Sequence, residues 1–374
     1  ENPFVVLNVS PRATRENLAT AKENAVWDLE VDEGVAVKAL SALQHPRDRL
    51  VTELSFLSSA SPAQCKTITA ALKKGQMPDA SGLSALDQAN LHAHALSMGK
   101  AGPDAINLLS RLHRKIDLSE VMREINANRQ LSREKSVDRA DVVAAFNTLV
   151  PRHAQAAAKV VAEDALKHVD GYQSAASIQA AERLVTEDVD SKSHFVAEFI
   201  EAYGSLTRSE LLRLSDRIDS AAAKLRIQPS IALAEKIADD LRQWDALRQP
   251  VQLWDQCHGI DEPESEALGK KLRELCIFLA NDKKSFDVAM IITKAMTDAF
   301  GELQGFSEEL EEDVETLEGL LEGQRIDQLA GPLKDAVEAA RAKLDTTAAA
   351  ISEGALTSKS NKTIVGLVEQ FKLS

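Results

Sequence analysis

A pair of histidines is the first feature of this sequence whose residue types could support chemistry. His92 and His94 stand two residues apart in LHAHAL, inside a segment with a helical apolar pattern. Residues two apart on a helix lie on different faces, whereas metal-binding pairs on helices use spacings of three or four. The sequence contains no HExxH motif, EF-hand loop or phosphate-binding glycine loop. We therefore expect surface or half-buried histidines here, no metal site and no bound cofactor.

A second candidate is the adjacent pair Cys257-His258 in WDQCHGID, with Asp255 and Asp261 nearby. A nucleophilic thiol needs a base close to it in space and a third group that orients the base. Adjacency in the sequence does not supply that geometry, so we expect the pair to be core or boundary residues at a helix end. No other catalytic constellation stands out, and the sequence predicts a non-enzymatic protein.

The stretch QHPRDRL contains His45, Pro46 and Asp48, which are the letters of a His-Pro-Asp tripeptide with one residue inserted. The apolar spacing around it predicts that one helix ends near His45. Pro46 then begins the next helix, because proline is favoured in a first turn. We expect His45 to cap the carbonyl groups of the preceding helix. Both residues therefore have a predicted structural role.

Composition narrows the class of protein. Lys and Arg number 44 against 58 Asp and Glu, and the net charge of −14 would repel a phosphate backbone, so we expect no nucleic-acid partner. No apolar run approaches the ~20 residues that a membrane span needs. Cys65, Cys257 and Cys276 show no CxxC spacing, which favours reduced thiols and a cytoplasmic location.

The dominance of Ala, Leu, Glu and Lys, together with helical apolar periodicity, predicts an all-α fold. A break is expected at Pro151 in an otherwise long helix. The body is expected to be a helical bundle or a set of irregular stacked helix pairs. Four units are predicted: a small helical hairpin unit at 1–58, a linker with one short helix at 59–82, a helical middle domain at 83–250 and a helical C-terminal domain at 251–374.

The small N-terminal unit is expected to have one shared core, because one set of residues gives its helices a common apolar face. Pro46 is expected to support this core as a structural residue. The predicted core members are Val5, Leu7, Leu18, Ala21, Leu40, Leu43, Leu50 and Leu54.

Residues 1–57 resemble a J-domain, the module with which DnaJ-type co-chaperones trigger ATP hydrolysis by DnaK-type chaperones. NPFVVLNVS resembles its opening helix and turn, ATRENLATAKENAVWDL its helix II, and VAVKALSAL its helix III. In that register Glu30-Val31-Asp32 occupies the signature site after helix II, whereas His45-Pro46-Arg47-Asp48 follows helix III. The His-Pro-Asp signature is absent, so the resemblance is to degenerate J-like domains that open larger helical bacterial proteins.

The resemblance implies a partner-binding surface on helix II and on the turn that follows it. Helix II of an authentic J-domain carries a basic cluster that meets an acidic face of the chaperone. Here six basic and nine acidic residues give residues 1–57 a net charge of −3, which weakens that docking. The partner-binding candidates are Arg12, Arg15, Lys22, Glu30, Val31 and Asp32.

Two functions follow from this resemblance. The first is a non-enzymatic co-chaperone or adaptor that engages a dedicated DnaK-like chaperone or ATPase through the J-like domain and the helical body. The alternative is a scaffold subunit of a multi-protein assembly, in which the J-like unit is a docking module without chaperone activity.

Two further candidate interaction segments lie near the C-terminus. In SEELEEDVETLEGLLEG the apolar residues Leu310, Val314, Leu317 and Leu321 follow spacings of four, three and four, which places most of the acids on the opposite, solvated face. A docking surface for a basic partner, or for the basic stretch 111–139, is the alternative. The apolar tail TIVGLVEQFKL at 363–373 is a docked terminal helix, a partner-binding helix or the stump of a removed segment.

Overall fold

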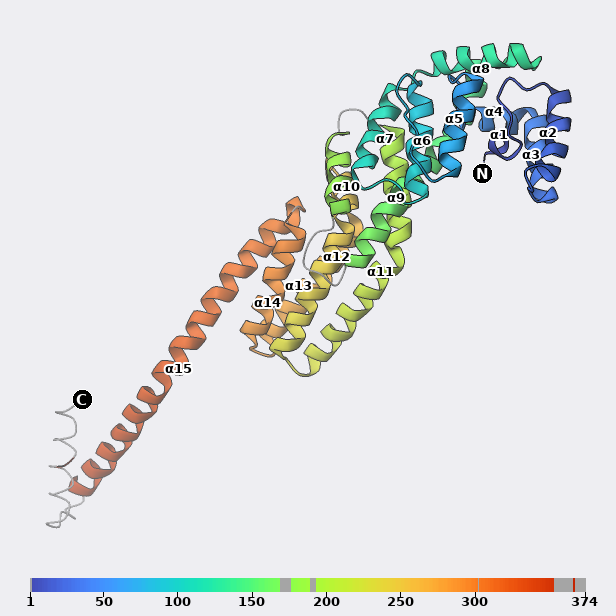
Figure 1. Ribbon diagram of the computed structural model, residues 1–374. Helices are drawn as coiled ribbons and strands as arrows, with labels where there is room; N and C mark the ends of the chain where they lie inside the picture. The colour runs from blue at the N-terminus through green and yellow to red at the C-terminus, as the bar shows by residue number, and fades with distance from the viewer. Residues whose placement is uncertain (1, 169–175, 189–192, 302, 353–365, 367–374) are drawn as a thin grey trace.

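The computed structural model describes residues 2–168, 176–188, 193–301, 303–352 and 366. These residues form fifteen α-helices and no strand, so the predicted all-α class is confirmed. Figure 1 shows an elongated molecule with the N-terminal helices at one end and a long helix projecting from the other. No helix in this described part of the chain combines the length and the apolar character that a membrane crossing requires.

The N-terminal end is built from five short helices with well-defined starts. Thr14 and Asn17 form a capping box for the second helix, and the Asp32 side chain accepts a hydrogen bond from the backbone of Val35 at the start of the third. The second and third helices pack side by side as a helical hairpin (Figure 1). The five are α1 (Pro3–Val6), α2 (Arg15–Trp27), α3 (Glu33–Gln44), α4 (Pro46–Leu54) and α5 (Pro62–Lys73).

The predicted N-terminal core divides between two clusters. Leu7, Leu18, Ala21 and Leu43 are buried together, with Val5 and Leu40 partly buried against them. Leu50 and Leu54 lie instead in a second cluster with Leu86, Ile125 and Leu149. The single shared core is therefore corrected, because α4 turns its apolar face towards later helices.

The unit boundaries also differ from those expected. Cys65 and Ile68 of α5, together with Leu91 of the sixth helix, belong to the same cluster as Leu18 and Leu43. No separate linker divides the first helices from the body, since this core is continuous across 58 and 82. The boundary expected at 250 falls inside an unbroken helix that contains Pro250.

His45 ends α3 and precedes α4, as predicted, and its backbone N–H donates to the carbonyl of Ser41 at 3.0 Å, whereas its side chain makes no hydrogen bond that caps α4. Its Nδ1 lies 3.2 Å from a carboxylate oxygen of Asp48 instead. Pro46 begins α4 and is exposed. His45 thus caps α3 through its backbone, while its side chain contacts the first turn of α4.

The body consists of packed long helices. The break expected at Pro151 is absent: one helix continues through it, because Val150, His153 and Ala154 are buried and their packing outweighs the hydrogen bond that proline removes. The body helices are α6 (Ala85–Ser97), α7 (Asp104–Lys115), α8 (Leu118–Ser132), α9 (Arg139–His168), α10 (Ala176–Thr186), α11 (His194–Ile227) and α12 (Ile231–Cys257).

The C-terminal end contains α13 (Pro263–Asn281), α14 (Phe286–Phe300) and α15 (Gln304–Ser352). The predicted apolar face of the acidic run packs on this end: Leu310 and Leu317 are buried, and Val314 and Leu321 are partly buried. Arg273 pairs with Glu309 and Asp313, and Lys294 with Glu318. Figure 1 places α8, which carries much of the basic stretch, at the opposite end of the molecule from α15. The tail 363–373 lies outside the described residues except for Gly366.

Candidate interaction site

The two arginines predicted to bind a partner, Arg12 and Arg15, make contacts within the chain. Arg12 Nε donates to the side-chain oxygen of Asn128 at 2.9 Å, and Asn128 in turn donates to the carbonyl of Ser58 at 2.7 Å. Arg15 Nε donates to Glu134 at 3.0 Å. Asn128 lies on α8, and Glu134 follows it directly. The N-terminal end of α2 is therefore held against α8, and we call this the anchored side of the α2–α3 hairpin.

A buried ion network lies beneath the anchored side. Arg49, which is 1% exposed, donates to Glu53 at 2.9 Å and to the carbonyl of Pro11 at 3.2 Å. The second oxygen of Glu53 accepts from Arg129 Nε at 2.8 Å. Glu134 also lies 3.4 Å from Arg49. Burial raises the pKa of the Glu134 carboxyl, but the hydrogen bond from Arg15 and the charges of Arg49, Arg15 and Arg129 outweigh it, so that pKa is lowered. The network joins α4 to α8 and fixes the hairpin to the body.

The opposite end of the hairpin is an exposed apolar surface, which we call the hairpin tip and define by Trp27, Leu29, Val35 and Val37. Trp27 is 82% exposed, and the other three are each exposed by more than two fifths. A tryptophan this open is unusual, because its large apolar ring is normally buried for most of its area. The tip thus presents an apolar anchor that nothing in the described chain covers.

The remaining partner-binding candidates lie at or beside the hairpin tip. Glu30 adopts a left-handed conformation with φ of 53°, which turns the chain between α2 and α3. Val31 is partly buried against the N-terminal core, while Asp32 caps α3. Lys22 lies 3.3 Å from Glu33 across the hairpin. The structure therefore gathers Lys22, Glu30, Val31 and Asp32 near the tip and separates Arg12 and Arg15 from them.

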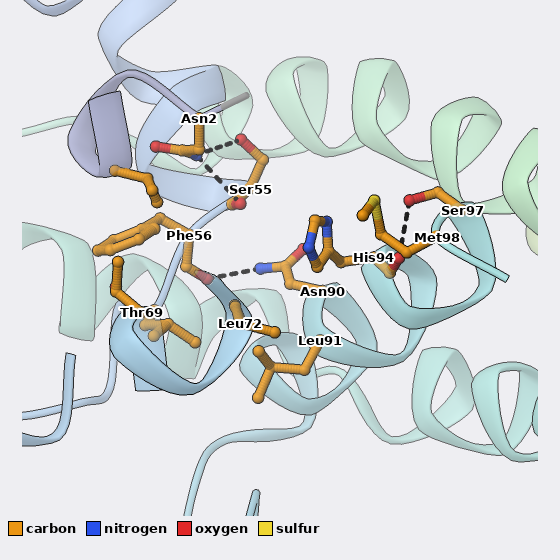
Figure 2. A pocket seen from close by; sticks show the side chains of 12 residues that line it. Asn2, Ser55, Phe56, Thr69, Leu72, Asn90, Leu91, His94, Ser97 and Met98 are labelled. Atoms are coloured by element: carbon orange, nitrogen blue, oxygen red, sulfur yellow. Dashed lines mark hydrogen bonds between the residues drawn. The ribbon is translucent and has the colours of Figure 1, made fainter. Parts of the chain in front are cut away.

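A cavity of about 600 Å³ opens beside the N-terminal core that contains Leu18 and Leu43, between α1, α5, α6 and the turn after α4. Figure 2 shows Asn90 reaching the carbonyl of Phe56, at 2.7 Å, and Asn2 held by Ser55. The Asn90 amide oxygen is buried and has no hydrogen-bond partner. The cavity is lined by Asn2, Val5, Ser55, Phe56, Leu57, Thr69, Leu72, Asn90, Leu91, His94, Ser97 and Met98.

The lining of this cavity favours binding over acid–base chemistry. Its area is mainly apolar, and His94 is the one ordinarily titratable side chain among the lining residues. General acid–base catalysis needs a side chain positioned to give or take a proton, and the lining residues other than His94 include neither a carboxylate nor a second imidazole. Such a lining suits an apolar side chain or a small apolar ligand.

The other sequence candidates stay apart. His94 faces the cavity, whereas burial lowers the pKa of His92. Burial raises the pKa of the Cys257 thiol, the opposite of what an activated nucleophile shows. His258 turns its Nδ1 towards the carbonyl of Trp254, at 2.7 Å. Among the residues that the structure describes, no group of three or more His, Cys, Asp or Glu side chains is placed to hold a metal ion.

Sequence reasoning missed a pair of histidines in the body. His113 Nε2 and His153 Nδ1 lie 3.0 Å apart, and the His113 ring stacks on Phe195 with 4.6 Å between the ring centres. Burial, followed by the neighbouring histidine, lowers the pKa of His113 to about 3; burial, followed by Arg152, lowers that of His153 to about 4. The two residues are 40 positions apart on different helices, so no local spacing could have paired them.

Comparisons with known proteins give no guide to this arrangement. No protein-family model matches the chain, and neither a curated protein nor a solved structure matches it significantly. The function is therefore inferred from the residues and their geometry.

Proposed function

We propose that this chain is a non-enzymatic adaptor that docks a protein partner through the hairpin tip. The observation that carries this proposal is the 82% exposure of Trp27 at the end of a well-anchored hairpin. Tryptophan is enriched among the few residues that contribute most of the binding energy in protein interfaces. Because the hairpin is fixed to the body, less conformational entropy is lost when that side chain binds a partner.

A DnaK-like chaperone is the partner that the J-like character of residues 1–57 suggests. The hairpin tip is the place where a J-domain carries its signature, which supports docking there. Glu30-Val31-Asp32 cannot supply the imidazole donor or the proline-fixed backbone of that signature. We therefore expect binding of a dedicated chaperone with little stimulation of a generic one.

The second candidate function is a scaffold subunit with no chaperone activity. The observation that favours it is the engagement of Arg12 by Asn128 and of Arg15 by Glu134, because the Glu134 carboxylate offsets the positive charge of Arg15 on the surface that a chaperone would meet. Under this proposal the hairpin tip contacts another subunit of an assembly. A reducing, cytoplasmic setting suits both functions, because Cys65, Cys257 and Cys276 are free thiols.

The test uses the full chain, its Trp27→Ala variant and purified DnaK-type chaperones, including any encoded beside its gene. Binding to one such chaperone that Trp27→Ala abolishes, with single-turnover ATP hydrolysis nearly unchanged, supports the adaptor. Binding to none of them supports the scaffold. Strong stimulation of a generic chaperone would show that the tip retains ordinary J-domain activity and would overturn the proposal.

A further inference from the structure

The distal half of α15 stands alone in the described chain. From 322 to 349 no residue is buried, and Figure 1 shows this half extending away from the other helices. Most helical stability in proteins comes from packing an amphipathic face rather than from intrinsic propensity. A projecting helix of this length therefore calls for a partner along its apolar face.

That face is a continuous stripe, which we call the distal stripe. Its spacings of three, four, four and seven keep it on one side of a helix with about 100° per residue. Leu329 is 82% exposed and Leu333 is 69% exposed. The members of the distal stripe are Ile326, Leu329, Leu333, Val337 and Leu344.

The distal stripe is separate from the face that docks α15 on the body. At about 100° per residue, the docked residues Leu310, Val314, Leu317 and Leu321 lie roughly 130° around the helix from it. They are buried or partly buried against the C-terminal cluster. One apolar face of α15, at 310–321, is thus covered within the chain. The distal stripe begins just after that face ends.

Charge changes at the same point along α15. Residues 307–322 hold eight acidic side chains and no basic one, whereas 324–349 hold four basic and four acidic side chains. A strongly acidic helix repels its own copy, but a balanced one does not. The distal half has the charge composition of a self-associating helix.

We propose that a second copy of this chain covers the distal stripe in an antiparallel two-helix contact. A symmetric dimer about Asp335 places Ile326 of one copy opposite Leu344 of the other, and Leu333 opposite Val337. The contact spans roughly 27 Å, which is 18 residues at 1.5 Å each. It buries five large apolar side chains from each copy.

Charge selects the antiparallel orientation. In a parallel pair the two acidic segments 307–322 would lie side by side, with eight negative charges on each. An antiparallel pair places these segments at opposite ends and keeps the two bodies apart. Like charges across an interface disfavour the wrong arrangement.

The first measurement is the mass of the full chain in solution by light scattering and sedimentation. We expect twice 40.6 kDa at concentrations on the order of 100 µM. Leu329→Asp should raise the dissociation constant by on the order of 100-fold, because the change occurs twice in a symmetric interface. Gln328→Asp is the matched control: it adds the same side chain one residue away, on the face opposite the stripe, and should leave the dimer intact.

Orientation is measured with introduced cysteines. Ile326→Cys copies should form disulfides with Leu344→Cys copies but not with each other, and the chain without an added cysteine controls for Cys257. A monomer at all concentrations, as expected if the tail 363–373 covers the stripe of its own chain, would overturn the proposal. A dimer that resists Leu329→Asp would do the same, and self-crosslinking of Ile326→Cys would overturn the antiparallel orientation.

Discussion

The anchored side of the α2–α3 hairpin and its tip belong to the same two helices but treat their side chains in opposite ways. Beneath the anchored side, the charged side chains of Arg49 and Glu53 on α4 are almost completely buried, and Arg15 at the start of α2 pairs with Glu134. At the tip, the apolar Trp27 is left in solvent. The anchored side fixes the hairpin to the body, whereas the tip exposes Trp27 to a partner. Substitutions can disrupt either role without the other.

The largest expected effect comes from the anchored side. Arg49→Ala leaves Glu53 buried with one of its two charged partners, and we expect it to lower the free energy of unfolding by about 3–5 kcal/mol. Denaturant unfolding measures this loss. Arg15→Ala, on an exposed side chain of the same network, is the control and should leave stability nearly unchanged. A loss under about 1 kcal/mol for Arg49→Ala would mean that the network does not fix the hairpin.

The next effect concerns the core between the two surfaces. Leu43 is fully buried, and Leu43→Ala should cost about 2–5 kcal/mol through the cavity it leaves. Val37→Ala, in the same helix but exposed at the tip, should change stability by no more than about 0.5 kcal/mol. Thermal and denaturant unfolding of both variants measure the contrast. Equal losses would contradict the assignment of α3 to one buried and one open face.

A pH titration measures how much the buried His113–His153 pair contributes to the stability of the helical body. The folded-state pKa is about 3 for His113 and about 4 for His153, whereas unfolded histidine takes up its proton near pH 6.5. The unfolded chain binds more protons below that pH, so stability falls as pH drops from about 7 to 4. We expect each of the two histidines to contribute a loss on the order of 3 kcal/mol by pH 4.

The variant His153→Gln isolates that contribution, because it removes one of the two titrating groups and should flatten the fall in stability between pH 7 and 4. His45→Gln, at an exposed position, is the control and should leave the slope as it is. Identical slopes for His153→Gln and the unchanged protein would show that the pair titrates normally.

The sequence predicts the α2–α3 hairpin better than the contacts that fix it to the body, for a physical reason. Leu7, Leu18 and Leu43 follow local helical spacing, and local spacing decides which face of a helix is apolar. The pairing of Glu53 with Arg129 joins residues 76 positions apart, and no local pattern encodes it. Pro151 shows the same limit, because tertiary packing keeps a helix intact where local preference would end it.

The candidate site was likewise predicted in part. Resemblance indicated the turn at Glu30, Val31 and Asp32, and these residues do lie beside the hairpin tip. The positive charges of Arg12 and Arg15 had no sequence signal for their capture by α8. Trp27 directly follows buried Ala25 and half-buried Val26, so its exposure follows from where α2 ends rather than from its residue type.

Site-specific photo-crosslinking in cells tests the central claim most directly. A photoreactive phenylalanine derivative replaces Trp27 at the hairpin tip or, as the control, Glu16 at the exposed start of α2. The adaptor proposal predicts one dominant protein adduct from position 27, identified by its mass as a DnaK-like chaperone, and little or none from position 16. Equal adducts from both positions, or a chaperone adduct from position 16 alone, would contradict docking through the tip.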